Sequence, residues 1–237
     1  MTIDITRFSL ALPSKGRLME DALDLFAAAG LPISKLGDER GYRGTISGMS
    51  EVEVVFLSAT EITRHLRDGA IDLGITGEDL LREHIADLAH HVDIALRLGF
   101  GAADVVCAVP ECWIDVSTME DLDEVSVRFH EAHERRLRVA TKYLNLTRVF
   151  FAEKGVRGYR IVESLGATEA APAAGAAEVI VDITSTGETL LANNLRILDD
   201  GVVLQSEAVA ARAHHVNQDP ARARIADLIL DDLRGAI

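Results

Sequence analysis

Val179–Ala192 (VIVDITSTGETLLA) shows how this chain of 237 residues is built. Its start, VIVDI, is almost wholly apolar, which is typical of a strand that helices cover on both faces of a sheet. The hydroxyl-rich turn Thr184–Gly187 follows, and Glu188–Ala192 then has the pattern of a helix. A buried strand that turns directly into a helix is the repeating unit of α/β proteins, so the stretch predicts that fold class.

The rest of the chain alternates in the same way. Phe8–Pro13 is an apolar run of strand length, and the apolar positions from Leu18 to Phe26 recur on one helical face. Such alternation over the whole length predicts an α/β fold with a mostly parallel sheet. We expect further strands at 52–57, 71–76, 94–98, 105–110, 137–142 and 159–162, and further helices over 62–69, 77–82, 119–134, 146–154 and 221–233.

Composition narrows the possible partners and the compartment. With 24 Lys and Arg against 38 Asp and Glu, the net charge is −14, which disfavours binding to nucleic acid or to an anionic membrane. No apolar run is long enough to cross a membrane, and the start of the chain lacks the pattern of a signal peptide. Cys107 and Cys112 do not form a C-x-x-C motif, so we expect a reduced, cytoplasmic protein.

Ligands of open α/β sheets bind beyond the carboxyl ends of the strands, so we examined the strand-to-helix turns. The first turn contains Lys15, Gly16 and Arg17. Cations at a helix N-terminus oppose the helix dipole, and an anion bound there by the free N–H groups would resolve the conflict. The alternative is a pair of solvated side chains on a loop.

The turn after VIVDI is the second candidate. Thr184, Ser185, Thr186 and Gly187 lead into the helix that contains Thr189, and hydroxyls, backbone N–H groups and the helix dipole together suit a phosphate. Asp182, at the end of the strand, can accept hydrogen bonds from sugar hydroxyls. The alternative is an ordinary helix cap, for which Ser and Thr are also favoured.

Two further places deserve mention. Lys142 follows the strand 137–142, and Asn145 would cap the next helix; an ordinary junction explains this turn equally well. Glu169 is the one charged residue of an Ala-rich stretch. His130 and His133 are spaced as metal ligands can be, but they lie in a charged run, and a solvated helix is the better interpretation.

Five segments, in order, resemble the catalytic subunit of the ATP phosphoribosyltransferase family, which carries out the first step of histidine biosynthesis. The chain is most similar to the short form, which lacks a C-terminal regulatory domain. The segments are LALPSKGRL (10–18), DLGITGEDLL (72–81), RVATKYLNLTRVFFAEKGV (138–156), GATEAAP (166–172) and EVIVDITSTGETLLANNL (178–195).

This resemblance implies a fold like that of type II periplasmic binding proteins, with two lobes that face a cleft. Lobe I would comprise residues 1–103 and 190–237, and lobe II residues 104–189. A small-ligand-binding protein without catalysis has the same architecture, because fold alone does not fix function.

The resemblance also implies roles for the turns. The loop from Asp182 to Thr189 would bind the 5′-phosphate of phosphoribosyl pyrophosphate (PRPP), and Glu169 and Asp182 would bind the ribose hydroxyls. Lys15 and Arg17 would meet phosphates, and an arginine of the stretch 40–43, preferably Arg43 rather than Arg40, would steady the leaving pyrophosphate. Gly16 and Lys142 complete the expected binding residues. Mg²⁺ would be carried by the substrate, not by protein ligands.

Two departures from the family pattern concern PRPP. Ile183 follows Asp182 where the related signature has a second acidic residue, and Ala167 stands where many relatives have Ser. By the same resemblance, the chain would form a homodimer within a hetero-oligomer, whose other component is a regulatory subunit similar to histidyl-tRNA synthetase.

Overall fold

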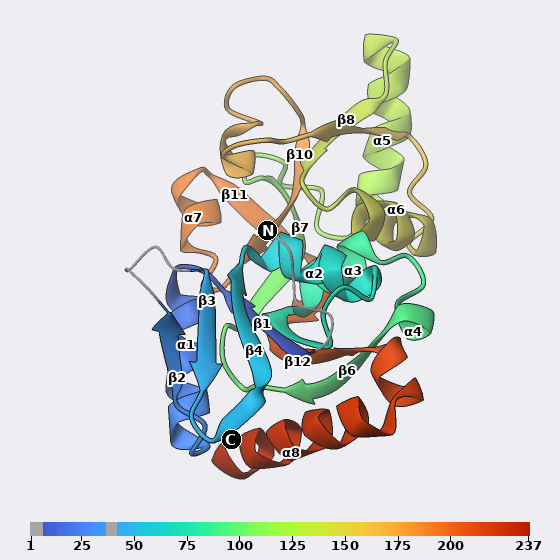
Figure 1. Ribbon diagram of the computed structural model, residues 1–237. Coiled ribbons are helices and arrows are strands. Elements are labelled where there is room, and N and C mark those ends of the chain that lie inside the picture. Colours follow the sequence, from blue (N-terminus) through green and yellow to red (C-terminus); the bar gives the residue numbers. More distant parts are fainter. Residues whose placement is uncertain (1–6, 37–41) are drawn as a thin grey trace. The chain divides into compact units, whose positions relative to one another are not determined.

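The computed structural model describes residues 7–36 and 42–237, which form two α/β units (Figure 1). The first unit ends at Gly101 and resumes at Glu207, and the second spans Ala102–Ser206. The expected α/β class agrees with this architecture. The expected return after residue 189 differs from the structure, because the strand β11 (Leu195–Ser206) pairs along β7 (Ala103–Pro110) in the sheet of the second unit.

The sheet of the first unit has the strand order β2-β3-β4-β1-β5-β12-β6. Parallel pairing joins β1 to β4 and to β5, whereas the neighbouring pairs are antiparallel. The prediction of a mostly parallel sheet is therefore wrong: the sheet is mixed because hairpins and a returning strand flank its parallel centre. The strands are β1 (Phe8–Pro13), β2 (Ile33–Leu36), β3 (Arg43–Ile46), β4 (Met49–Leu57), β5 (Leu73–Gly77), β6 (Val92–Arg97) and β12 (Ala208–Ala213).

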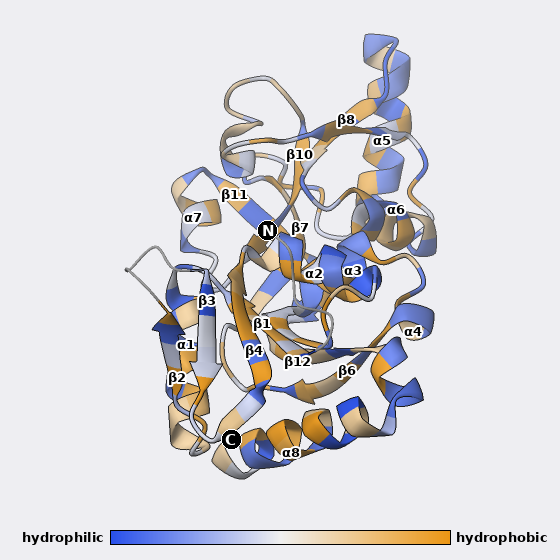
Figure 2. Ribbon diagram, viewed as in Figure 1, coloured by the Kyte–Doolittle hydropathy of each residue, from blue (hydrophilic) through white to orange (hydrophobic). Residues whose placement is uncertain are grey.

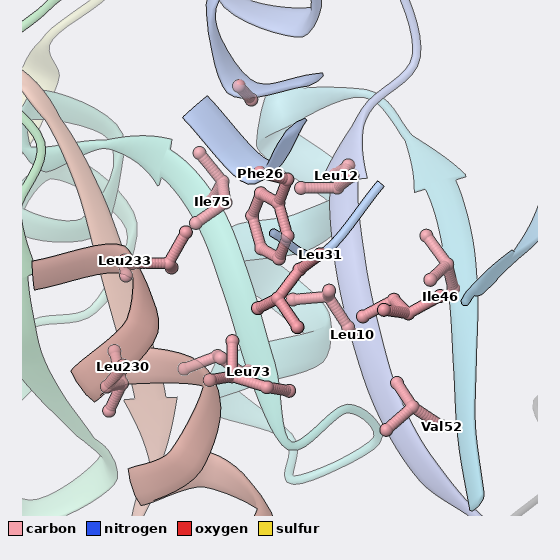
Figure 3. Close-up of a cluster of buried hydrophobic side chains, with 14 of the residues drawn as sticks. Leu10, Leu12, Phe26, Leu31, Ile46, Val52, Leu73, Ile75, Leu230 and Leu233 are labelled. Atoms are coloured by element: carbon pink, nitrogen blue, oxygen red, sulfur yellow. The ribbon is translucent and has the colours of Figure 1, made fainter. Parts of the chain in front are cut away.

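Helices cover both faces of this sheet. The core on one face contains Leu10 and Leu12 of β1, which lie beside Phe26 of α1, while Leu230 and Leu233 come from α8 (Figure 3). Ala11, between the two leucines, points to the other face, where it belongs to a second core with Ile62 of α2. The helical segments are α1 (Arg17–Ala28), α2 (Ala59–Arg67), α3 (Glu78–His84), α4 (Leu88–His91), η2 (His214–Gln218) and α8 (Pro220–Ala236).

The second unit has a five-stranded sheet in the order β11-β7-β10-β8-β9. The strand β10 (Val179–Thr184) runs parallel to β8 (Leu137–Thr141), which is parallel to β9 (Tyr159–Glu163), while β7 is antiparallel to both its neighbours. In Figure 2, hydrophobic residues predominate along β8 and β10, whereas α5 carries many hydrophilic residues. The helical segments are α5 (Met119–His133), α6 (Leu144–Glu153), η1 (Thr168–Ala170) and α7 (Glu188–Ala192).

The predicted bounds of β1 and α7 agree with the structure, and most other predicted elements are present with shifted ends. The prediction that Asn145 caps a helix is wrong. The helix α6 begins at Leu144, and the Tyr143 N–H donates to the Thr141 hydroxyl at 2.8 Å, so Thr141 orders this turn. None of the helices in the described ranges is long and apolar enough to span a membrane.

Candidate active site

The turn between β1 and α1 is shaped by a glycine. Gly16 has a φ of 74°, a conformation that residues with a Cβ rarely adopt, and Arg17 begins α1 directly after it. Within the described residues, no side chain caps this helix, so its first backbone N–H groups are open to a ligand. The Ser14 N–H donates to the Leu57 carbonyl at 2.8 Å and fixes the turn to the end of β4.

Two cationic side chains of this turn lack ion-pair partners among the described residues. Lys15 and Arg17 are exposed, and neither has an ion-pair partner among the residues that the structure places. Arg43, on β3, differs from them because its Nε is 3.2 Å from Oε1 of Glu53 on β4. The Glu53 side chain is only 7% exposed. The Arg43 side chain remains 48% exposed. Arg40 and Gly41 lie outside the described residues.

A cavity of about 510 Å³ opens beside this turn within the first unit. Its lining includes Lys15 and Tyr42, as well as Ser58 and Glu61, which follow β4. Because Pro13 and Leu57 are paired at the ends of the parallel strands β1 and β4, the cavity lies at the edge of the sheet where ligands of α/β proteins bind.

The lining also includes Glu61, whose carboxylate is held by hydrogen bonds. The Ser58 hydroxyl accepts a hydrogen bond from the Glu61 N–H, and Glu61 Oε2 accepts the Ser58 N–H at 3.0 Å and the Ser58 hydroxyl at 2.7 Å. This capping box starts α2. The hydrogen bonds from Ser58 hold the pKa of Glu61 below its usual value, so its carboxylate is charged at neutral pH.

The hydroxyl-rich loop of the second unit is ordered by its own hydrogen bonds. The Gly187 N–H donates to the Thr184 hydroxyl at 2.9 Å, and the Glu188 N–H donates to the Thr186 hydroxyl at 3.3 Å. Gly187 has a φ of 77° and leads into α7. Ser185 and Thr189 are exposed. The loop therefore combines hydroxyls that cap the backbone with hydroxyls that point to solvent.

Asp182 lies at the base of this loop and is 8% exposed. Its Oδ1 accepts the Ile183 N–H at 2.9 Å. Burial raises the pKa of Asp182, and the opposing influence of Ile183 and of the Lys142 charge does not cancel it. The charge of Glu169 on η1 also raises this pKa, which places Lys142, Glu169 and Asp182 within electrostatic reach of one another. Lys142 and Asp182 directly follow Thr141 and Val181, which are paired on β8 and β10.

The structure thus gathers the predicted residues into two groups, one in each unit. Lys15, Gly16 and Arg17 share one turn, and Lys142, Glu169 and Asp182 surround the base of the loop 184–187. Sequence reasoning missed Tyr42, Glu61 and Thr168, whose side chain acts to lower the pKa of Asp182. The S-x-x-E spacing of Ser58 and Glu61 was a readable signal for the start of α2, although not for a site.

The sequence of this chain matches one protein family. Residues 58–235 match the family described as ATP phosphoribosyltransferase, and these residues include α2 and the whole loop of the second unit. The chain belongs to the ATP phosphoribosyltransferase family. Both Glu61 and the group around Asp182 therefore lie in the part of the chain that matches the family.

Individual relatives agree with this membership. The chain is 62% identical over 210 residues to an ATP phosphoribosyltransferase of Rhodopseudomonas palustris (strain BisB18), covering 88% of this chain and 65% of the relative. It is 59% identical over 219 residues to an ATP phosphoribosyltransferase of Mesorhizobium japonicum, covering 91% of this chain and 94% of the relative. The chain thus spans less than two thirds of the first relative's length and nearly all of the second's.

Solved structures give the same result at the level of the fold. A chain of the ATP phosphoribosyl transferase (HisG:HisZ) complex from Thermotoga maritima superposes with a TM-score of 0.71 at 25% identity, covering 97% of this chain and 98% of that chain. An arginine-binding protein from the same organism superposes with a TM-score of 0.54 at 16% identity, covering 98% of this chain and 96% of that chain, and shows the shared binding-protein fold alone.

Proposed function

We propose that this chain catalyses the reaction for which its family is named. It transfers the phosphoribosyl group of PRPP to N1 of ATP and releases pyrophosphate, which is the first step of histidine biosynthesis. The observation that carries the proposal is the group around Asp182, where a buried carboxylate, a lysine and an ordered hydroxyl loop meet at the end of β10 in a chain of this family.

The second unit supplies the groups suited to the phosphoribosyl part of PRPP. Ser185, Thr189 and the backbone of the loop that Thr184 and Thr186 order would bind the 5′-phosphate. Asp182 and Glu169 would accept hydrogen bonds from the ribose hydroxyls, and Lys142 would compensate their charge. Binding energy from the remote phosphate would then orient the ribose for reaction.

The first unit supplies cations that would bind the leaving pyrophosphate of PRPP or the triphosphate of ATP. Lys15 and Arg17 are free to meet such anions at the open start of α1. Arg43, whose side chain is 48% exposed on β3, would act as a second arginine toward pyrophosphate. Because Glu53 already offsets some of its charge, we expect Arg43 to contribute less than Arg17.

The chemistry needs little proton transfer. N1 of adenine has a lone pair at neutral pH, so no strong base has to create the nucleophile. As the bond from ribose C1 to pyrophosphate breaks, positive charge grows on the ribose and negative charge on the leaving group. Catalysis would therefore come mainly from positioning and from cations that stabilise the leaving group.

We expect Mg²⁺ to arrive with the pyrophosphate of PRPP, because Mg²⁺ is commonly bound through substrate phosphates and few protein ligands. When bound, it would neutralise part of the leaving charge. Cations and hydroxyls, the chemical types found in both groups, would bind phosphate oxygens that the metal leaves uncovered.

Assembly is the second part of the proposal. We infer a cytoplasmic hetero-oligomer in which a homodimer of this chain joins a regulatory subunit similar to histidyl-tRNA synthetase. The similarity to a chain solved as a HisG:HisZ complex supports a protein partner.

A pyrophosphate-release assay with ATP, PRPP and Mg²⁺ tests both parts. We expect release from this chain, stimulated by the candidate partner from the same organism. Omitting ATP or PRPP is the control and should abolish release. No release in the presence of the partner would refute the activity, and full activity without it would refute the required partner.

A further inference from the structure

Two oppositely charged side chains line the cavity of the first unit. They are Lys15, a cation without a partner in the described part of the chain, and the ionised Glu61, and the described residues show no ion pair between them. A polyphosphate is attracted to Lys15 and repelled by Glu61. A nucleotide in this cavity would therefore place its phosphates toward Lys15 and its base toward Glu61.

An aromatic residue, Tyr42, lines the same cavity. Tyr42 is 63% exposed, and its carbonyl accepts the Phe56 N–H at 2.9 Å, which fixes its backbone to β4. An exposed aromatic ring offers a flat face on which a base can stack. The cavity volume of about 510 Å³ is within the usual range of small-molecule sites.

Glu61 also has a specific hydrogen-bonding capacity. Its Oε2 is engaged by Ser58, whereas Oε1 has no partner among the described residues. A carboxylate accepts hydrogen bonds and donates none. It therefore pairs with the 6-amino group of adenine and is repelled by the 6-oxo group of hypoxanthine or guanine.

We propose that Tyr42 and Glu61 select the purine base of the nucleotide substrate, with Tyr42 stacking on the ring and Glu61 accepting a hydrogen bond from the 6-amino group. This inference rests on the proposed function, because it assigns the nucleotide to this cavity. Glu61 acts as a specificity residue: its contact with the amino group leaves the neighbouring N1 lone pair free to attack.

The test compares binding of ATP with binding of its 6-oxo analogue, inosine triphosphate, by calorimetry. Wild-type protein should prefer ATP. In Glu61→Gln, the amide can serve either base, so the ATP preference should fall by roughly ten- to a hundredfold, the usual value of a hydrogen bond to a charged group. Glutamine is also accepted in a capping box, so α2 should persist.

Asp121→Asn is the matched control, because Asp121 fills the same capping position in α5, in the second unit. It should leave the ATP preference unchanged. Tyr42→Ala should weaken both nucleotides equally, while Tyr42→Phe, which keeps the ring, should not. An unchanged ATP preference in Glu61→Gln, in a protein whose wild type releases pyrophosphate, would overturn the inference and leave the proposed function intact. A wild type that releases none would instead refute the proposed function.

Discussion

The Thr184 hydroxyl accepts a hydrogen bond from the Gly187 N–H at 2.9 Å, so the backbone of the loop after β10 is held by a side chain of the loop itself. Gly187 supports this arrangement with its φ of 77°. A phosphate that enters such a loop does not have to order the backbone first. Preorganisation of this kind improves affinity because less conformational freedom is lost on binding.

Thr184→Val should therefore weaken PRPP binding. Valine has nearly the shape of threonine but no hydroxyl to accept the Gly187 N–H, so the loop should lose order. We expect KM for PRPP to rise roughly tenfold, the value of about one hydrogen bond, with a smaller change in kcat. Thr184→Ser keeps the hydroxyl and should resemble wild type; equal effects of both variants would contradict this role.

Asp182→Asn should weaken PRPP binding as well, for a different reason. The amide keeps the size of the side chain but replaces a charged acceptor with a neutral one, and hydrogen bonds to charged groups are the stronger. We expect the dissociation constant for PRPP to rise roughly tenfold or more. Calorimetry with PRPP and Mg²⁺ measures it, and an unchanged constant would remove Asp182 from the ribose site.

The raised pKa of Asp182 predicts a pH dependence of that affinity. Burial favours the protonated form, so this carboxyl gains its proton at a higher pH than an ordinary aspartate does. As the pH falls, PRPP affinity should decline earlier than an ordinary aspartate would predict. Asp182→Asn has no proton to gain at this position, so its affinity should be flatter with pH. Parallel pH profiles of the two proteins would contradict the assignment.

The sequence predicts those parts of the site whose residues are close together along the chain. Lys15, Gly16 and Arg17 are adjacent in the chain, and the loop 184–187 follows a strongly apolar strand, so periodicity alone located both turns. The meeting of Lys142 with Asp182 depends instead on the pairing of Thr141 with Val181 between β8 and β10. Single-sequence periodicity contains no information on which strands become neighbours.

The same limit explains the errors in the fold. The strand β11 carries charged and polar residues and a register shift after Ile197, so it lacks a clean alternating pattern and was not predicted. The boundary after residue 189 came from the family resemblance and not from periodicity, and in the structure the second unit continues to Ser206. The ion pair of Arg43 with Glu53 could not be predicted from the sequence either, because it depends on the register of β3 against β4.

Arg17→Ala should lower turnover more than it affects binding. Arg17 is exposed at the open start of α1 without a partner in the described chain, so its charge is available to the leaving pyrophosphate. Loss of a group that stabilises developing charge costs roughly a hundredfold in kcat. Arg17→Lys, which keeps the charge but not the fork of donors, should recover part of this loss. A change confined to KM would reassign Arg17 to ground-state binding.

Glu178→Gln should destabilise the second unit in a pH-dependent way. Glu178 is 12% exposed, and its Oε1 is 2.6 Å from Nη2 of Arg138 and 3.0 Å from Nη2 of Arg135. Burial alone would raise the pKa of Glu178, but the hydrogen bonds from Arg138 and Arg135 outweigh it and lower the pKa from 4.5 to about 2.

Because this pKa is lower in the folded than in the unfolded state, the carboxylate stabilises the fold above about pH 4.5, and that stability is lost as the pH falls toward 2. The difference between the two states corresponds to about 3 kcal/mol at neutral pH. Urea unfolding of wild type and Glu178→Gln should show a gap of this order at pH 7 that narrows by pH 3. Glu124→Gln removes an exposed partner of Arg128 and is the control, with a gap of less than about 1 kcal/mol at every pH. A gap for Glu178→Gln that stays constant with pH would show that packing, not ionisation, accounts for the effect.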